Sequence, residues 1–300
     1  MAQIRTNGIN LEYETLGSKS DPAVLLIMGL GGQLTVWQDS FCEGLAAKGF
    51  RVIRFDNRDV GKSTHLLDKG VPDVPGMMAK AAAGQPVQAP YSLTDMAGDA
   101  VGLLNGLDVD RAHIVGASMG GMITQLVGVH YPAKAKSLVS IMSTTGRRDL
   151  PQARPEAIAA LMTPPKSDSR EDRIAAGVNT WRTIGSPGYA ASDAELRARV
   201  ERDVDRAPDE PSGFARQLAA IIAAPPRYEI LRSVRAPTLV IHGADDPLVP
   251  LEGGKDTAAS IPGAELVIVP GMGHDFTEAL TPVMLKHVGD FLLAVEARAG

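Results

Sequence analysis

A serine flanked by glycines, between a predicted strand and a predicted helix, constrains the fold of this chain most tightly. Residues 112–115 form an apolar run typical of a buried strand, and residues 119–130 have a helical pattern. Between them, residues 116–120 read G-A-S-M-G, a G-x-S-x-G sequence. The chain must reverse sharply at Ser118, and small flanking residues leave room for that turn. We therefore expect Ser118 to project as a nucleophile; the alternative is a small residue that merely suits a tight turn.

Strand and helix signals alternate along most of the chain, which is typical of a parallel α/β sheet covered by helices. Asn7 and Gly8 predict a hairpin turn before the first of these strands. The expected strands cover residues 10–15, 23–28, 51–55, 112–115, 137–142, 238–242 and 265–269. The expected helices cover residues 37–48, 91–107, 119–130, 254–260 and 277–295.

Two segments depart from this alternation. Residues 66–90 are rich in Pro, Gly, Met and Ala and predict a long loop. Residues 147–232 have no good strand signal and carry several helical stretches separated by proline-rich breaks. We therefore expect a first part of the core at 1–146, a helical cap at 147–232 and a second part of the core at 233–300. The helical stretches of the cap are expected near 153–162, 169–183, 193–205 and 212–224.

Composition and charge argue against several classes of function. The chain has 30 basic and 35 acidic residues, a net charge of −5, without the basic stripe of a nucleic-acid surface. No apolar run approaches the roughly 18 residues of a membrane helix, and the N-terminus has no signal-peptide pattern. The single cysteine, Cys42, fits a reducing compartment. We expect a cytoplasmic protein with no nucleic-acid or membrane partner, as a monomer or homodimer.

A serine nucleophile needs a base, and the base needs an orienting acid; the later chain offers both. His274 follows the expected strand at 265–269, and Asp245 and Asp246 follow the strand at 238–242. Such loops lie beyond the C-terminal ends of parallel strands, where open α/β sheets build their sites. The order Ser, Asp, His therefore predicts a catalytic triad, in which the spacing leaves the choice of aspartate open. The other five histidines lie in less suitable contexts.

Two glycine-rich stretches resemble nucleotide-binding motifs, but each lacks a glycine that its motif requires. Residues 29–32 read G-L-G-G after a strand, but Leu34 stands where G-x-G-x-x-G needs its last glycine. Residues 61–64 read G-K-S-T, but Asp56 occupies the position of the first P-loop glycine. No His, Cys and carboxylate cluster has metal-ligand spacing. We therefore expect no cofactor and no metal.

Three motifs carry a resemblance to a known family. Residues 55–64 read F-D-N-R-D-V-G-K-S-T, residues 110–120 read D-R-A-H-I-V-G-A-S-M-G, and residues 270–274 read P-G-M-G-H. Over essentially its whole length the chain resembles the α/β-hydrolase superfamily, most closely the group of aclacinomycin methylesterase and small bacterial carboxylesterases. The resemblance implies an α/β-hydrolase fold, a mostly parallel central sheet flanked by helices, with a helical cap inserted after the sixth strand. Asp59 replaces the glycine of the more common pattern D-x-R-G-x-G-x-S, a feature of the methylesterase group.

The resemblance also implies roles for individual residues. Ser118 would attack an ester carbonyl, His274 would shuttle the proton, and an aspartate would hold the imidazolium. Asp246 is the preferred acid because relatives place theirs directly before a Pro-containing turn, with Asp245 as the fallback. The main-chain amides of Met119 and Leu30 would form the oxyanion hole. Met28 replaces the histidine of the usual His-Gly-x loop, which leaves open how the loop is braced.

The cap and the excursion at 66–90 should cover the mouth of the active site and shape an apolar pocket. Core packing is an equal or better explanation for several of the side chains that could line it. The leading hypothesis is a serine hydrolase that cleaves small to medium apolar esters through an acyl-enzyme. The alternatives are a cofactor-free haloperoxidase-like perhydrolase, a lactonase or carbon–carbon bond hydrolase, and a non-catalytic binding protein. The candidate substrate contacts are Gly29, Trp37, Met77, Met78, Trp181 and Phe214.

Overall fold

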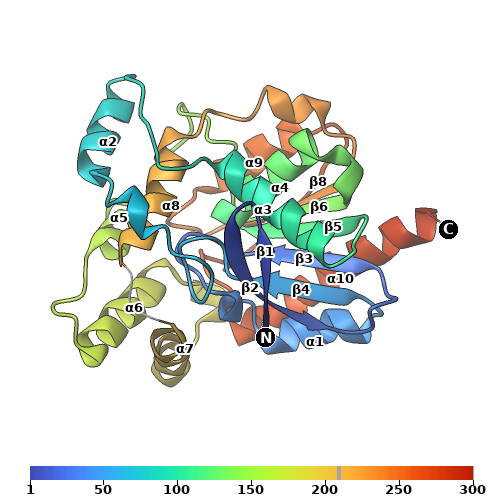
Figure 1. Cartoon of the computed structure of the whole chain (residues 1–300), viewed down its shortest axis with the longest axis horizontal. Helices are drawn as coiled ribbons and strands as arrows, with labels where there is room; N and C mark the ends of the chain where they lie inside the picture. The colour runs from blue at the N-terminus through green and yellow to red at the C-terminus, as the bar shows by residue number, and fades with distance from the viewer. Residues whose placement is uncertain (208–210, 300) are drawn as a thin grey trace.

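A single eight-stranded sheet forms the centre of the protein, which a computed structural model describes for residues 1–207 and 211–299 (Figure 1). The strand order is β1-β2-β4-β3-β5-β6-β7-β8. The pairs β1–β2 and β2–β4 are antiparallel, and all other neighbours are parallel, as expected. The strands are β1 (Ala2–Thr6), β2 (Ile9–Leu16), β3 (Ala23–Ile27), β4 (Arg51–Phe55), β5 (Ala112–Ala117), β6 (Ala135–Ile141), β7 (Thr238–Gly243) and β8 (Glu265–Val269).

The predicted hairpin opens the sheet. Asn7 and Gly8 connect β1 to β2, and both have positive φ angles, 48° and 79°. A two-residue turn with left-handed φ at both positions matches the right-handed twist of the strands that it joins. The hairpin forms one edge of the sheet, and its turn lies beyond the C-terminal end of β4, since Tyr13 pairs with Phe55 and Leu16 pairs with Val52.

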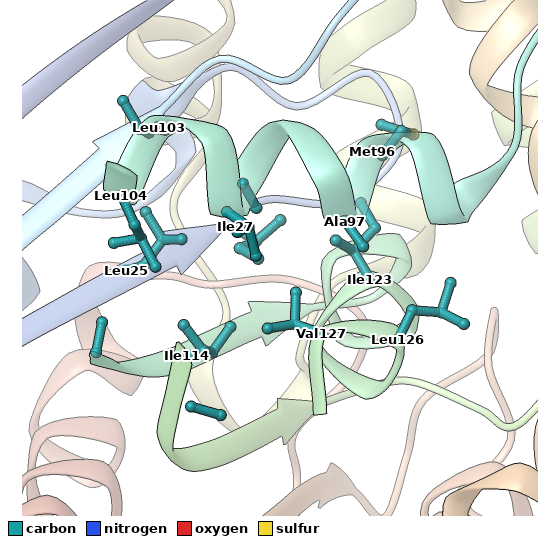
Figure 2. Close-up of a cluster of buried hydrophobic side chains, with 14 of the residues drawn as sticks. Leu25, Ile27, Met96, Ala97, Leu103, Leu104, Ile114, Ile123, Leu126 and Val127 are labelled. Carbon is teal, nitrogen blue, oxygen red and sulfur yellow. The ribbon is translucent and has the colours of Figure 1, made fainter. Parts of the chain in front are cut away.

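Helices cover both faces of the sheet, because alternate side chains of each strand point to opposite faces. Leu25, Ile27 and Ile114 pack against α3 (Leu93–Gly106) and α4 (Met119–His130), as Figure 2 shows. The other face, with Leu26 and Val115, packs against α1 (Asp39–Ala47) and α10 (Thr281–Ala299). Helix α9 (Leu251–Ser260) packs on β7 and β8. Two apolar layers thus hold the loops at the strand ends in place.

The segment 66–90 contains a helix where the sequence predicted only a loop. Helix α2 (Val74–Ala82) begins at Asp73, whose side chain accepts a hydrogen bond from the Gly76 amide, and Pro75 lies in its first turn. Both features favour a helix start, and the abundance of Pro and Gly in the segment obscured them. Helix α2 packs against the cap helix α8 (Pro211–Ala223).

The expected helical insertion lies between β6 and β7. Within the described residues of this segment, four α-helices occur and no strand, and their labels, α5 to α8, lie in the left half of Figure 1. The cap boundaries at 147 and 232 stay a prediction. Besides α8, these helices are α5 (Pro155–Met162), α6 (Arg170–Ile184) and α7 (Asp193–Arg206).

Short 3-10 helices connect several of these elements. Across residues 1–207 and 211–299, each helix is too short or too polar to span a bilayer. The 3-10 helices are η1 (Leu34–Val36), η2 (Leu67–Lys69), η3 (Pro132–Lys134), η4 (Pro187–Tyr189), η5 (Ile230–Ser233) and η6 (Glu278–Leu280).

Candidate active site

Ser118 lies at the turn between β5 and α4, with a left-handed φ of 56°. The flanking glycines are required by close backbone approaches. A Cβ on Gly116 would lie 2.1 Å from the Gly120 carbonyl oxygen, and one on Gly120 would lie 2.0 Å from that of Ile27. The turn is therefore sterically restricted to the small residues that the sequence supplies, and it holds the serine in a conformation that side chains rarely adopt.

Ser118, His274 and Asp246 form a chain of hydrogen bonds. His274 Nε2 lies 2.9 Å from Ser118 Oγ, and His274 Nδ1 lies 2.7 Å from Asp246 Oδ2. An imidazole whose Nδ1–H donates to a carboxylate leaves Nε2 free to accept the serine proton. The three residues come from the ends of β5, β7 and β8, which are brought together by the parallel sheet.

Of the two candidate acids, only Asp246 contacts the histidine. Its second oxygen, Oδ1, accepts hydrogen bonds from the amides of Leu248 and Val249, at 2.9 and 2.8 Å. Asp245 is exposed, and its carboxylate instead accepts from the Gly271 amide at 2.8 Å. The geometry therefore favours Asp246 as the group that orients the imidazole.

His242 is a buried neighbour of this carboxylate. Its Nε2 donates to the Val249 carbonyl at 2.8 Å and lies 3.7 Å from Asp246 Oδ2. Burial lowers the pKa of His242, which favours the neutral ring. His242 therefore packs beside the acid as a neutral ring, which adds no competing charge.

The loop after β3 lies directly against the nucleophile. A Cβ on Gly29 would lie 2.9 Å from Ser118 Cβ, so only glycine allows this approach. In the described part of the chain, the Leu30 amide has no hydrogen-bond acceptor. Met119 is the first residue of α4, where amides have no intrahelical acceptor. Both predicted oxyanion donors are therefore available beside Ser118.

Side chains that the sequence analysis missed brace this loop. The Asn57 side-chain amide donates to the Met28 carbonyl at 2.9 Å, and Gln217 Oε1 accepts from the Gly31 amide at 2.8 Å. The fully buried Asp56 accepts from the Leu34 amide at 2.7 Å, which gives it a structural role. Asn57 could have been found in the F-D-N-R-D motif that carries the family resemblance, whereas nothing in the local sequence marks Gln217.

The predicted substrate contacts are dispersed. Trp37 is fully buried in the core, where its ring stacks on Phe41 and meets the edge of Phe276. These ring contacts are with core residues, and the role of Trp37 as a substrate contact stays a prediction. The Phe214 ring lies close to the loop after β3: a Cβ on Gly31 would be 3.0 Å from its nearest ring atom.

The remaining candidates lie on α2 and α6. Met77 is buried, whereas Met78 is 42% exposed. The guanidinium carbon of Arg199 lies 3.7 Å from the centroid of the Trp181 ring. Trp181 also lines a surface pocket of about 370 Å³, together with Asp245. These three side chains therefore have different surroundings, and none has a hydrogen bond or ring contact with the Ser118–His274–Asp246 chain.

Two other kinds of reactive group were possible in the described residues, a metal cluster and a nucleophilic thiol. Among the described residues, no three His, Cys, Asp or Glu side chains gather in a way that could hold a metal ion. Cys42 is fully buried, and burial raises the pKa of its thiol to about 12. A thiol with that pKa stays protonated at neutral pH and is a poor nucleophile.

The chain is similar to known proteins over most of its length. A family described as alpha/beta hydrolase fold matches residues 22–278. Rhodomycin D methylesterase DnrP of Streptomyces peucetius is 28% identical, over 90% of this chain and 91% of its own. A protein of Variovorax paradoxus (strain S110) with the provisional name carbamate hydrolase RutD is 30% identical, over 96% and 97%. A solved structure of a mutant of the meta-cleavage product hydrolase CumD of Pseudomonas fluorescens IP01 superposes with a TM-score of 0.75 at 21% identity, covering 98% of each chain.

Proposed function

The protein is a hydrolase that belongs to the alpha/beta hydrolase fold family, and we propose that it cleaves carboxylic esters through a Ser118–His274–Asp246 triad. The observation that carries this proposal is the continuous hydrogen-bond chain from Ser118 Oγ through His274 to Asp246 Oδ2. A serine hydroxyl is a weak nucleophile by itself, and an adjacent oriented imidazole is what activates it.

The proposed reaction has two halves. Ser118 Oγ attacks the ester carbonyl carbon while its proton moves to His274 Nε2, and the amides of Leu30 and Met119 hold the resulting oxyanion. The tetrahedral intermediate collapses, the proton passes from His274 to the leaving alkoxide, and an acyl-enzyme remains. Water then attacks the acyl-enzyme by the same route, which releases the acid and restores the serine. Throughout, Asp246 keeps the imidazole oriented and stabilises its charged form.

The proposed substrates are small to medium esters with apolar groups. The buried Met77 and the Phe214 ring beside the oxyanion loop are apolar groups suited to such a ligand. The similarity to a methylesterase supports ester cleavage in particular, since DnrP is named for that reaction. Fold alone would not separate esters from other acyl compounds.

Active-site labelling tests the proposal. We expect a fluorophosphonate probe to label Ser118 and Ser118→Ala to abolish both labelling and turnover of a short-chain p-nitrophenyl ester, by about 10⁴-fold or more. Ser233→Ala, which removes an exposed serine outside the site, is the control and should label normally. A folded wild-type protein that the probe leaves unlabelled would overturn the proposal.

A further inference from the structure

A side chain from the cap completes the support of the oxyanion loop, residues 29–32. Gln217 on α8 is fully buried and binds two core loops at once. Its Oε1 accepts from the Gly31 amide at 2.8 Å, and its Nε2 donates to the Arg58 carbonyl at 2.7 Å. Because both polar ends of the amide are used, the side chain has one defined orientation.

These contacts restrain the peptide group that carries the Leu30 amide. On one side, Asn57 holds the Met28 carbonyl at 2.9 Å; on the other, Gln217 holds the Gly31 amide. The Gly29–Leu30 peptide lies between these two restrained peptide groups. With three glycines in four residues, the loop could adopt many other conformations without such restraints.

The turn of α8 that carries Gln217 is itself anchored to the core. The neighbouring Arg216 forms a bidentate ion pair with Asp59, at 2.9 and 2.7 Å, and both side chains are fully buried. A Cβ on Gly213 would lie 2.2 Å from the Asp59 carbonyl oxygen, so helix and loop touch at the backbone. Asp59 has a φ of 67°, a conformation that favours glycine, yet this position carries an aspartate, whose carboxylate binds Arg216. This anchor defines the position from which Gln217 reaches the loop.

We propose that Gln217 is a positioning residue for catalysis, through which the cap holds the Leu30 amide toward the oxyanion. The inference rests on the ester hydrolase function proposed above. It means that the inserted helices are part of the catalytic apparatus as well as its cover. A positioned donor stabilises the oxyanion more than the ground-state carbonyl, so the effect belongs to kcat.

The test uses full-length Gln217→Met, which removes both hydrogen bonds at similar volume. We expect kcat for a p-nitrophenyl ester to fall about 10- to 100-fold with little change in KM, because a slightly misplaced donor loses most of its effect. Binding of a trifluoromethyl ketone, which forms a tetrahedral adduct, should weaken by the same factor. Gln217→Glu keeps an oxygen for the Gly31 amide but loses the donor to the Arg58 carbonyl, so it should recover only part of the rate.

Gln125→Met is the matched control. Gln125 is also a buried glutamine, and it binds Arg227 and the Thr144 carbonyl, away from the oxyanion loop. We expect this variant to keep the wild-type kcat. Should Gln217→Met not fold, Gln217→Asn, whose amide is one methylene shorter and cannot reach Gly31, replaces it with the same expected loss of kcat.

Two outcomes separate the inference from the function on which it rests. If fluorophosphonate labels wild-type Ser118 but the folded Gln217 variants keep kcat and ketone affinity, the positioning role is wrong and the esterase proposal stands. Equal losses of kcat in Gln217→Met and Gln125→Met would also overturn the positioning role, since they would reflect stability alone. An unlabelled wild-type protein would remove both proposals.

Discussion

Asp245 and Asp246 show how one position along the chain changes the role of a carboxylate. Both follow β7, but Asp246 turns inward to His274 Nδ1, whereas the exposed Asp245 caps the Gly271 amide. The buried carboxylate is held by two amides and by the imidazole. In the proposed reaction, this set of contacts orients the ring and stabilises its protonated form.

At this scale we expect Asp246→Asn to lower kcat by about 10³- to 10⁴-fold, because an amide can hold the imidazole in the wrong tautomer. Asp245→Asn should change kcat little, since its amide oxygen still accepts from the Gly271 amide. Steady-state turnover of a p-nitrophenyl ester compares the two isosteric variants. A larger loss in Asp245→Asn would reassign the acid.

Among elements, the contact between β5 and α10 contains a buried histidine that the proposed reaction does not use. His113 lies 2.7 Å from Ser137 Oγ and 2.9 Å from Glu296 Oε1, and Lys136 lies 2.8 Å from the same carboxylate oxygen. Burial lowers the pKa of His113 from 6.5 to about 4, although Glu296 opposes the shift. The folded protein therefore favours the neutral imidazole.

The sign of the resulting pH dependence follows from this pKa. Between pH 6.5 and about pH 4, His113 is protonated in the unfolded chain but stays neutral in the folded protein. The free energy of unfolding therefore decreases as the pH is lowered from 6.5 to about 4. The loss over this range should be about 3 kcal/mol, at about 1.4 kcal/mol per pH unit. Urea unfolding between pH 7 and 4 measures it.

The variant His113→Gln, which cannot titrate, is the control for this stability measurement. Carboxylates also titrate as the pH falls, so the readout is the difference between the wild-type and variant curves. The variant should lose less of its free energy of unfolding over the same range. Parallel curves for the two proteins would contradict the assignment to His113.

For the whole molecule, two buried ion pairs join cap and core. Arg216 on α8 binds Asp59, and Arg206 at the end of α7 binds Asp56 at 2.7 Å, with both partners of each pair buried. Removing one member of a buried pair leaves a charge without its compensating partner in a site poor in water. The cap is therefore attached by contacts that are costly to break.

Asp59→Asn should accordingly lower the free energy of unfolding by about 3 kcal/mol or more. The matched control is Asp205→Asn, which breaks the exposed bidentate pair with Arg170 within the cap and should cost far less, because water screens exposed charges. Urea unfolding of both variants under identical conditions makes the comparison. Equal losses would show that burial of the Asp59 pair contributes nothing.

The sequence determined what depends on neighbours along the chain. Apolar runs identified the parallel strands, the glycines around Ser118 required the sharp turn before α4, and the hairpin followed from Asn7 and Gly8. These features are local, because steric limits on φ and ψ and the side-chain periods of strands and helices act over a few residues. The order of Ser, Asp and His could be interpreted for the same reason, since each follows a recognisable strand.

Only the tertiary structure decided which distant groups meet. Gly31 and Gln217 are 186 positions apart, and Asp59 and Arg216 are 157 apart, so no local pattern records either contact. Trp37 likewise packs into the core with Phe276, which lies at the other end of the chain. Such pairings depend on how helices and loops pack in three dimensions, where burial makes a hydrogen bond or ion pair specific. The contacts that brace residues 29–32, which the sequence left open at Met28, are of this kind.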